Sequence, residues 1–329
     1  MAVVGFRGRA LSSDHWVVRA IRDEGLGGVI LFARNIVSVD QLAELTGALH
    51  EAATGRTLLI AVDQEGGSVA RLNPDNGFPE TQSQADIGRA GDPTGARQAA
   101  RQTGMTLAGM GINLNLAPVV DINVNPTNPS IGALGRSFSA DPQVVIDMAT
   151  AVILGLHDAG VRSTLKHFPG LGSATGDTDR EFVDVTQTWS RAELEPFARL
   201  AADGLPEAVM VANALNGQLD MQKPSSLSAP TIDVLRGDLG WDGVVITDDL
   251  QAGALRAAYD EQAIVRLAVG AGNDLLLFAN TQQTVRTDIV ATTVATIVDL
   301  VEQGKVDEAR IDASVARIGR MIDRVSAPR

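Results

Sequence analysis

Acidic and basic side chains stand directly after several short apolar segments of this sequence. The segments and the polar residues that follow them are "TLLIAV" with Asp63, Glu65 and Arg71, "NLNLAPVV" with Asp121, "STL" with Lys166 and His167, "AVMVA" with Asn213, and "GVVIT" with Asp248 and Asp249. Such a group of side chains fits two kinds of chemistry. One is glycoside hydrolysis, in which a pair of carboxylates cleaves the bond while other polar groups hold sugar hydroxyls. The other is the chemistry of a metal-dependent lyase, in which acids are hard oxygen ligands.

The loop after the fifth apolar segment is unusually polar. It reads "KHFPGLGSATGDTD" over residues 166–179, with glycines in its middle and Asp177 and Asp179 at its end. Taken singly, each motif has a plain structural explanation: the Lys-His pair could form a salt bridge at a strand end, and Asp248-Asp249 could cap the next helix. The recurrence of charge at successive strand ends favours a common site instead.

The polar residues fall at the same point of a repeated pattern, in which apolar segments alternate with longer helical ones. The apolar segments are residues 2–6, 27–33, 57–63, 113–122, 163–168, 208–214, 243–249 and 273–279. They do not alternate between apolar and polar residues, which is typical of parallel strands buried on both faces. The helical segments are residues 14–24, 40–53, 93–110, 141–158, 190–203, 254–271, 283–303 and 307–324. Ser190, with Glu193 three residues on, is among the helix-start signals.

This order of strands and helices predicts a (β/α)8 TIM barrel, in which catalytic groups stand at the C-terminal ends of the strands. No linker or low-complexity segment divides the chain, so residues 1–329 are expected to form one catalytic domain. A doubly wound sheet is the alternative fold. It would normally show a glycine-rich phosphate turn after its first strand, and "GFRGRA" is too poor in glycine for that turn.

The composition of the chain limits its partners. A formal net charge of −13 argues against nucleic acid and anionic membranes as partners. There is no cysteine, which excludes disulfides and thiolate metal sites. No apolar run approaches the roughly 18 residues of a membrane span, and the N-terminus lacks a leader pattern, so a cytoplasmic protein is expected.

Six motifs of the chain occur together in an order that one enzyme family shares. They are "GGVILFARN", "VDQEGGSVAR", "LAPVVDIN", "IGALGRSF", "KHFPG" and "GVVITDDL", and they span essentially the whole chain. In order and spacing they resemble the bacterial β-N-acetylglucosaminidases (β-N-acetylhexosaminidases) of glycoside hydrolase family 3. The pair "KHFPG" and "VDQEGG" is highly specific for this resemblance.

The resemblance implies a fold, an activity and roles for individual residues. The fold would be a barrel, and the activity a retaining exo-hydrolysis that releases terminal N-acetylglucosamine from peptidoglycan-derived or chitooligosaccharide-like glycosides. Asp248 matches the nucleophile, and the residues that match those holding the sugar ring are Asp63, Arg71, Arg136, Lys166 and His167. Asp249 would support the site or cap a helix. No cofactor and no metal is expected, the partner is a small carbohydrate, and a monomer is favoured.

The polar loop departs from the pattern of this family. Its members usually carry a pattern like Asp-Ser-His there, in which the His is the acid/base and the Asp orients it. This chain has Asp177-Thr178-Asp179, and Leu171 where a His is common. The segment "IGALGRSF" is also longer than usual before Arg136, so the pocket is expected to differ in shape on that side.

Three interpretations of the altered loop remain open. In the first, Asp179 is the acid/base of a two-carboxylate glycosidase, and the charge of Asp177 raises its pKa. In the second, another acid, Glu65 or Asp177, serves. In the third, the chain keeps the fold and the sugar pocket but is a sugar-binding protein with impaired catalysis. The metal-dependent lyase needs about three oxygen ligands around one ion, and the lysine and arginines beside the acids argue against it.

Overall fold

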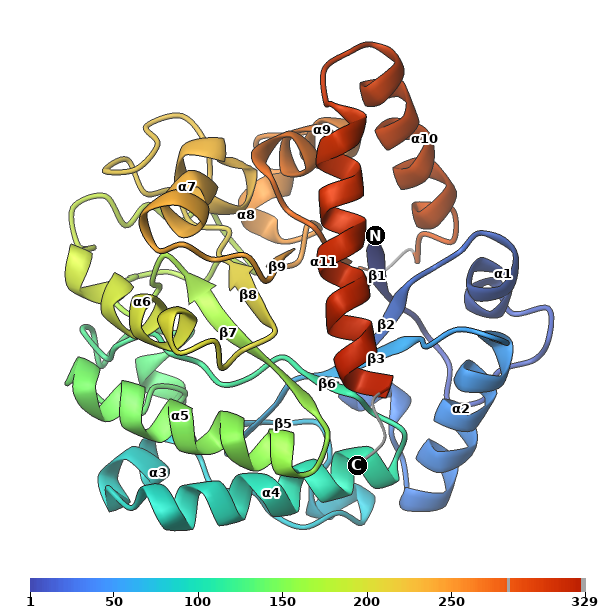
Figure 1. Cartoon of the computed structure of the whole chain (residues 1–329). Coiled ribbons are helices and arrows are strands. Elements are labelled where there is room, and N and C mark those ends of the chain that lie inside the picture. The colour runs from blue at the N-terminus through green and yellow to red at the C-terminus, as the bar shows by residue number, and fades with distance from the viewer. Residues whose placement is uncertain (283–284, 327–329) are drawn as a thin grey trace.

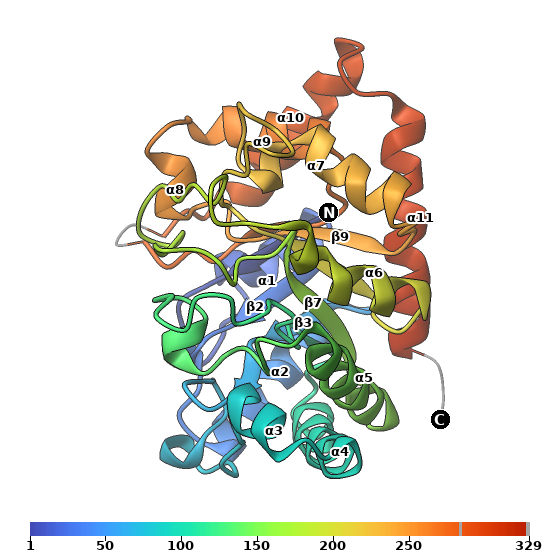
Figure 2. The ribbon, with the colours of Figure 1, turned by 90° about the vertical axis from the view of Figure 1, so that its left-hand side faces the viewer.

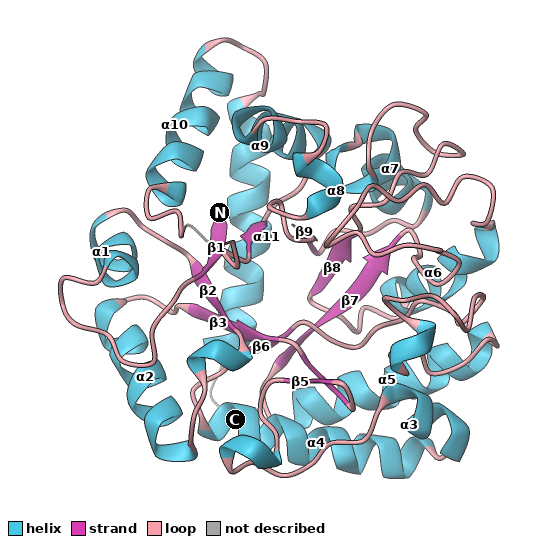
Figure 3. Ribbon diagram, turned by 180° about the vertical axis from the view of Figure 1, so that it is seen from behind, coloured by secondary structure: helices cyan, strands magenta, loops and turns pink. Residues whose placement is uncertain are grey.

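The chain folds into a barrel of parallel strands (Figure 1, Figure 3). The computed structural model describes residues 1–282 and 285–326, and its main sheet has eight strands in the order β10-β1-β2-β3-β6-β7-β8-β9. Their bounds are β1 Ala2–Gly5, β2 Gly28–Leu31, β3 Leu59–Val62, β6 Leu114–Asn115, β7 Arg162–Phe168, β8 Ala208–Val211, β9 Val244–Thr247 and β10 Leu276–Phe278. A parallel bridge between Ile246 and Leu275 closes the sheet. The predicted (β/α)8 barrel is confirmed.

Helices surround the barrel (Figure 2). They are α1 Trp16–Asp23, α2 Val39–Ala52, α3 Gln84–Ala90, α4 Pro93–Gly109, α5 Pro142–Asp158, α6 Glu195–Ala202, α7 Ala229–Asp233, α8 Gly253–Arg256, α9 Glu261–Ala271, α10 Ile289–Glu302 and α11 Glu308–Ser326. Strand side chains pack both inside the barrel and outward on the helices, which explains the unbroken apolar runs of the sequence. Helix α11 covers the end where the strands begin, and its Ile318 and Met321 join the inner cluster. The other end of the barrel therefore remains for the site.

The fourth strand is shorter than the predicted segment 113–122. It ends at Asn115, and Val119 makes only an isolated bridge to Lys166. The side chain of Gln84 takes the place of a neighbouring strand, since its Nε2 donates to Val119 O at 2.7 Å and its Oε1 accepts from Val119 N at 2.9 Å. Pro118, which has no N–H to donate, also interrupts the ladder.

The helical predictions differ from the structure in several places. Helix α3 lies where the sequence pattern predicts no helix, and the described part of the predicted helix 283–303 becomes helical only at Ile289. The segment 254–271 forms two helices, because Asp260 accepts a hydrogen bond from Ala263 N at 2.7 Å and starts α9. The segment 190–203 begins with a 3₁₀ turn, Arg191–Leu194, before α6. Helix α7 and the π-helical turn Val234–Asp238 lie between β8 and β9, where the sequence pattern predicts no helix. The first two residues of the predicted helix 283–303 lie outside the described residues.

The elements that position the site come from most of the chain. The eight strands span residues 2 to 278, and α10 and α11 follow them. That residues 1–329 form a single domain stays a prediction, since residues 283–284 and 327–329 are outside the described part. Among the helices of the described residues, none combines the length and the apolar character that a membrane span requires.

Candidate active site

A cavity of about 320 Å³ opens at the C-terminal end of the barrel strands. All the residues to which the sequence assigns a catalytic or sugar-holding role line it: Asp63, Arg71, Arg136, Lys166, His167, Asp177, Asp179 and Asp248. They follow β3 and β9, belong to the end of β7, or lie in the loops after β6 and β7. The barrel thus brings residues that are far apart in the sequence into one site, as the rule for strand ends predicts.

Lys166 is the centre of an ion-pair network on one wall of the cavity. Its Nζ lies 2.8 Å from Asp63 Oδ1 and 2.6 Å from Glu65 Oε1. Arg136 binds the same Glu65 with two nitrogens, with Nε 2.7 Å from Oε2 and Nη2 2.8 Å from Oε1. Arg71 makes a longer contact, with Nη2 3.5 Å from Asp63 Oδ2. Two carboxylates therefore fix three cations in this wall.

Burial and ion pairing act in opposite directions on these groups. Burial alone would raise the pKa of Glu65, but Arg136 and Lys166 hold it far below its usual range. Burial would likewise raise the pKa of Asp63, and Lys166 and Arg71 lower it instead. Burial would lower the pKa of Lys166, yet the two carboxylates raise it. The wall therefore stays charged at neutral pH, and it offers charge-assisted hydrogen bonds to a sugar.

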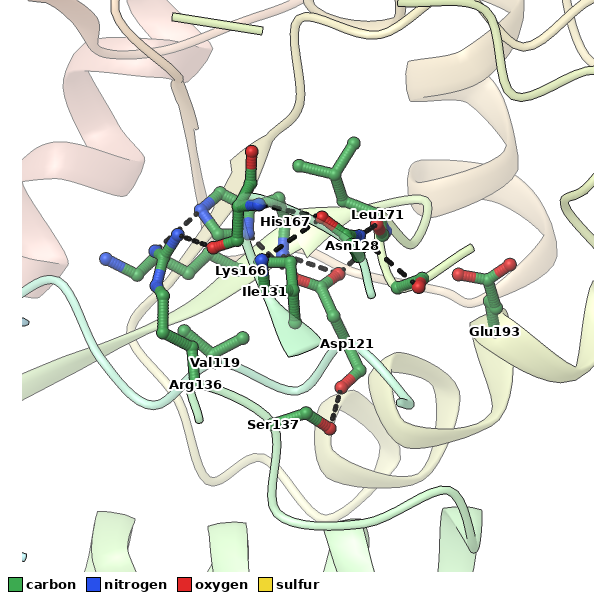
Figure 4. Close-up of polar contacts among 12 residues, drawn as sticks. Val119, Asp121, Asn128, Ile131, Arg136, Ser137, Lys166, His167, Leu171 and Glu193 are labelled. Atoms are coloured by element: carbon green, nitrogen blue, oxygen red, sulfur yellow. Dashed lines mark hydrogen bonds and ion pairs between the residues drawn. The ribbon is translucent and has the colours of Figure 1, made fainter. Parts of the chain in front are cut away.

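His167 is held in place by Asp121. Its Nδ1 lies 2.7 Å from Asp121 Oδ2, and the carboxylate also accepts the N–H groups of His167 at 3.1 Å and of Leu171 at 2.8 Å (Figure 4). The other ring nitrogen, Nε2, lies 3.5 Å from Arg136 Nη2. Asp121 therefore fixes the orientation of the imidazole and leaves Nε2 on the side of Arg136.

Lys166 and His167 both line the cavity although they are neighbours in β7. Adjacent residues of a regular strand face opposite sides of the sheet. The pairing of β7 with β8 shifts its register between Leu165 and Phe168, so the regular alternation does not hold at this point.

Asp248 and Asp249 follow β9 and have different surroundings. Asp249 Oδ1 accepts hydrogen bonds from Gln251 N at 3.0 Å and Ala279 N at 2.9 Å, so it ties the end of β9 to the end of β10. Burial raises the pKa of Asp249 to about 7. Within the described residues, the carboxylate of Asp248 accepts one hydrogen bond, from Asp249 N at 2.7 Å. The supporting role expected of Asp249 fits this geometry, and Asp248 keeps an oxygen for the cavity.

The loop that carries Asp177 and Asp179, residues 169–179, is called the acid loop below. Its tip is tied to α8, the helix that follows Asp248. The two backbone hydrogen bonds are Gly253 N to Asp179 O at 2.9 Å and Ala254 N to Thr178 O at 3.1 Å. Asp177 Oδ1 accepts Asp179 N at 3.1 Å and shapes the tip. The acid loop thus spans from the end of β7 to the segment that follows the proposed nucleophile.

Asp179 and Asp249 are cavity carboxyls whose surroundings favour the protonated form, and of these Asp249 is tied to the backbone of Gln251 and Ala279 while Asp179 lies on the acid loop. Partial removal from water raises the pKa of Asp179 to about 6, and the negative charges of Asp248 and Asp177 add to this effect. The side chain of Asp179 still has a face exposed to solvent. Water there screens part of the effect, and a bound sugar that displaces the water would strengthen it. The sequence predicts the contribution of Asp177 but not that of Asp248, which comes from a different strand end.

Glu65 and Asp177 are the alternative acids. Glu65 is bound by two cations and stays ionised at neutral pH, so it has no proton to donate to a leaving group. Asp177 accepts the backbone N–H of Asp179 and lies 3.2 Å from Arg180 Nε. These contacts suit a residue that orients Asp179 and adds negative charge beside it. The geometry therefore favours Asp179 over both alternatives.

The longer segment before Arg136 forms a 3₁₀ turn, Gly132–Leu134. Ser68 Oγ donates to Leu134 O at 2.9 Å and ties the turn to a hairpin of β4 Gln64–Gly66 and β5 Val69–Ala70. Arg136 Nη1 donates to Ser130 O at 2.7 Å across the base of the turn. The extra length therefore places the half-exposed Leu134 on the cavity while Arg136 still reaches Glu65.

Three residues support the site through contacts that the sequence analysis does not predict. Glu65 bridges two cations, Asp121 orients His167, and Asn213 Nδ2 donates to Asp249 O at 2.8 Å. The signal that points to them is the same as for the assigned residues, a polar side chain at the end of a buried strand. What sequence position does not reveal is which partner each of them contacts.

Asp63 and Glu65 in the cavity are paired with cations, and the Asp248 and Asp249 carboxylates accept backbone N–H groups. Among the described residues, no group of three or more His, Asp and Glu side chains is placed to hold a metal ion. Asp63 and Glu65 contact Lys166 instead. The geometry therefore gives the metal-dependent lyase no support.

The chain is similar to known proteins over most of its length. A family model described as "Glycosyl hydrolase family 3 N terminal domain" matches residues 4–321. A β-hexosaminidase of Xylella fastidiosa (strain 9a5c) is 38% identical over 287 residues, which cover 84% of this chain and 82% of the relative. One of Bordetella avium (strain 197N) is 38% identical over 270 residues, or 79% of this chain and 75% of the relative.

Solved structures agree with this similarity. A glycoside hydrolase family 3 β-N-acetylglucosaminidase from Paenibacillus sp. str. FPU-7 has a TM-score of 0.91 at 36% identity; the match covers 100% of this chain and 62% of that one. A β-N-acetylhexosaminidase from Beutenbergia cavernae DSM 12333 has a TM-score of 0.87 at 34% identity, over 97% of this chain and 95% of the other. The chain belongs to glycoside hydrolase family 3, a family of enzymes that hydrolyse O-glycosyl bonds.

Proposed function

We propose that the chain is a retaining exo-β-N-acetylglucosaminidase (β-N-acetylhexosaminidase) with Asp248 as nucleophile and Asp179 as acid/base. The observation that carries this proposal is that both carboxyls line one cavity, where burial, and after it the charge of Asp248, raises the pKa of Asp179. One acid thus keeps its proton while its partner carries charge, the division of roles that double displacement requires. The names of the relatives, β-hexosaminidase and β-N-acetylglucosaminidase, support N-acetylglucosamine as the sugar.

In the first step, an oxygen of Asp248 attacks the anomeric carbon of the bound sugar. The bond between this carbon and the glycosidic oxygen breaks, and the proton of Asp179 moves to that oxygen, so the aglycone leaves as a neutral alcohol. The product is a glycosyl ester on Asp248 and a carboxylate on Asp179.

In the second step, the carboxylate of Asp179 takes a proton from a water molecule. The water oxygen attacks the anomeric carbon, the ester bond to Asp248 breaks, and the sugar leaves with retained configuration. Asp248 is again a carboxylate and Asp179 again holds its proton, so the cycle closes without any other reactant.

The ion-pair wall supplies the groups that hold the ring. Lys166 and the arginines donate charge-assisted hydrogen bonds, and Asp63 accepts from hydroxyls. Their mutual ion pairs fix them before the sugar arrives, which lowers the entropy cost of orienting the ring. The cavity of about 320 Å³ lies at the small end of the range for ligand pockets. We therefore infer that it takes one terminal sugar at a time.

A slow 5-fluoro N-acetylglucosaminyl donor tests the nucleophile. The fluorine slows the second step, so we expect the sugar ester to accumulate on Asp248, where mass spectrometry of proteolytic peptides locates it. Proton NMR of the hydrolysis of an ordinary substrate should show the β-anomer as the first product. A label on a different acid, or the α-anomer first, would overturn the assignment.

Activity is also expected to be independent of metal. The negative charge of Asp63 and Glu65 is balanced by Lys166 and Arg136, so the sugar-holding wall needs no cation from solution. Exhaustive treatment with a chelator, followed by dialysis, should leave kcat/KM unchanged. Loss of activity that Mg²⁺ or Mn²⁺ restores would contradict this prediction.

A sugar-binding protein with impaired catalysis is the second candidate. One observation favours it: Asp179 stands where the resemblance to the family predicts a His. Such a protein would bind N-acetylglucosamine in a calorimetric titration but would hydrolyse phenyl β-N-acetylglucosaminide, whose poor leaving group needs an acid, no faster than a variant that lacks Asp248. Turnover well above that variant decides for the hydrolase.

The wider setting of the enzyme rests on the sequence alone. A peptidoglycan-derived or chitooligosaccharide-like substrate, the monomeric state, the lack of nucleic-acid or membrane partners and a cytoplasmic location remain predictions. Hydrolysis of the aryl N-acetylglucosaminide, compared with hydrolysis of the matching glucoside and xyloside, would test which sugar the enzyme prefers.

A further inference from the structure

Glu193 is a fully buried acid that the mechanism above does not use. It belongs to the 3₁₀ turn before α6, and its exposed fraction is 0%. Its Oε2 accepts a long hydrogen bond from Ser173 N at 3.3 Å. Within the described residues, its Oε1 and the hydroxyl of Ser173 are both buried without a hydrogen-bond partner, and no cation pairs with the carboxyl. A carboxylate anion is poorly solvated in such surroundings.

Glu193 lies directly beneath the start of the acid loop. Gly170 packs on it so closely that a Cβ at position 170 would lie 2.5 Å from Glu193 Cβ. Ser173, which donates to Glu193, belongs to the same segment of the loop. Figure 4 shows Glu193 beside the segment that carries Leu171 and apart from the contacts of Arg136. Glu193 is therefore one of the contacts that set the path of the chain from His167 to Asp179.

Other contacts hold the same stretch from the opposite side. Asp121 accepts Leu171 N at 2.8 Å, and Asn128 Nδ2 donates to Leu171 O at 2.7 Å. The chain between Gly170 and Ser173 is thus held between Asp121 on one side and Glu193 on the other. Any change at Glu193 acts on a segment that also orients His167 through Asp121.

We propose that Glu193 is a positioning residue that works as a neutral carboxylic acid. In this form it holds the start of the acid loop, and its ionisation loosens the loop and withdraws Asp179 from the leaving group. The part that concerns Asp179 rests on the proposed function. The part that concerns the loop rests on the burial and contacts of Glu193.

The charges around Glu193 support the neutral form. Burial raises its pKa to about 7 and the negative charge of Asp121 across the loop adds to this, while the contacts with Ser173 and with the backbone of Ser190 oppose it. The acid loop contributes no titratable side chain before Asp177. On the side of the 3₁₀ turn and α6, Arg191 and Glu195 are exposed to solvent.

Ionisation loosens the loop because the anion needs water or a cation. The short stretch from Gly170 to Ser173 packs against Glu193 on the side of the acid loop. Moving this stretch admits water at less cost than keeping a bare anion buried. The acid loop should therefore be well ordered below neutral pH and looser above it.

The test that does not depend on catalysis is limited cleavage by trypsin after Arg180, whose side chain is 83% exposed at the tip of the loop. We compare wild type with Glu193→Gln, which is isosteric and neutral at every pH. Glu195→Gln, the same change at an exposed acid nearby, is the control. At each pH, the cleavage rate of wild type is divided by the cleavage rate of Glu193→Gln. This ratio should be at least about threefold higher at about pH 8.5 than at about pH 6.5, since the carboxyl ionises between these values. Glu195→Gln should behave like wild type.

The second test is the pH dependence of kcat/KM for phenyl β-N-acetylglucosaminide, whose poor leaving group needs the acid. In wild type, kcat/KM should fall about tenfold for each pH unit above about 6, and about a hundredfold for each unit once Glu193 also ionises above about 7. In Glu193→Gln, the decrease of kcat/KM that begins at about pH 6 should remain, and the steeper decrease above about pH 7 should be absent. With the 2,4-dinitrophenyl glycoside, both proteins should show the same flat profile.

Each outcome bears on one part of the proposal. Equal tryptic cleavage of wild type and Glu193→Gln at both pH values would overturn the role of Glu193 in the loop. A pH-dependent cleavage with identical kinetic profiles would overturn its link to Asp179. If none of the proteins hydrolyses either glycoside, the proposed function fails, and the cleavage result still decides whether Glu193 holds the loop.

Discussion

Replacement of Asp248 by Asn should lower kcat/KM for aryl β-N-acetylglucosaminides by about 10⁴- to 10⁶-fold, the range seen when an enzyme loses its nucleophile. The amide keeps the size of the side chain and can still accept the N–H of Asp249, so the fold at the end of β9 is retained. What is lost is the negative oxygen that forms the glycosyl ester. The loss should be equally large for good and poor leaving groups, because both pass through this ester.

Asp249→Asn is the matched control for this variant. The two positions are adjacent, but burial raises the pKa of Asp249 to about 7, so below neutral pH the wild-type side chain is mostly protonated and, like an amide, uncharged. An amide oxygen can still accept from Gln251 N and Ala279 N. We expect a loss of kcat/KM below about tenfold, as for a supporting hydrogen bond. A larger loss at Asp249 than at Asp248 would reverse the roles of the two acids.

Much of the fold follows from the sequence because parallel strands leave a strong signal. Runs such as "GVVITDD" are apolar on both faces, and a polar residue marks the point where each strand ends. The end of a strand is harder to predict where a side chain replaces backbone pairing. The side chain of Gln84 makes the hydrogen bonds to Val119 that a neighbouring strand would make. The sequence of the segment 113–122 does not predict this contact with a glutamine from another part of the chain.

The residues of the site could be predicted from position, but their pairing could not. That Lys166 and Asp63 approach one another follows from the geometry of strand ends. Glu65 forms ion pairs with both Lys166 and Arg136. Its position is set by the short hairpin after β3, in which the strand that carries Glu65 pairs with the two-residue strand β5. Partners of this kind lie far apart in the sequence and are set by short loops, whose conformations have no periodic signal.

Glu193 illustrates a case in which a local pattern predicts only part of what a residue contacts. Ser190 followed by Glu193 matches a capping box, which predicts that the glutamate reaches back to the start of its own helix. In the structure Ser190 makes no side-chain capping bond, while the carboxyl of Glu193 interacts with the backbone of Ser190, as the pattern predicts, and also faces Ser173 in the acid loop. A capping pattern describes a possible local partner. It does not reveal that a distant loop will cover the same carboxyl.

Replacement of Asp179 by Asn should separate substrates by their leaving groups. For phenyl β-N-acetylglucosaminide, kcat/KM is expected to fall about 10²- to 10⁴-fold, the usual contribution of a general acid. For the 2,4-dinitrophenyl glycoside it should stay close to wild type, because this leaving group departs without a proton. Asp177→Asn, which leaves Asp179 in place but removes one of the charges that raise its pKa, should cost less and shift the pH dependence to lower pH. If Asp179→Asn cleaves phenyl and dinitrophenyl glycosides at wild-type rates, Asp179 is not the acid.

The pH dependence of kcat/KM, compared between wild type and Asp179→Asn, is an independent test of Asp179 as the general acid. A general acid works only while protonated, and kcat/KM reports the free enzyme, in which the pKa of Asp179 is about 6. For poor leaving groups, kcat/KM should therefore be level below about pH 6 and decrease above it. Water at the exposed face of Asp179 screens its neighbours, which moves the decrease toward lower pH and never toward higher pH. In Asp179→Asn the decrease near pH 6 should vanish, because the group that titrates there is gone. If the decrease of kcat/KM near pH 6 is still present in Asp179→Asn, another carboxyl donates the proton to the leaving group.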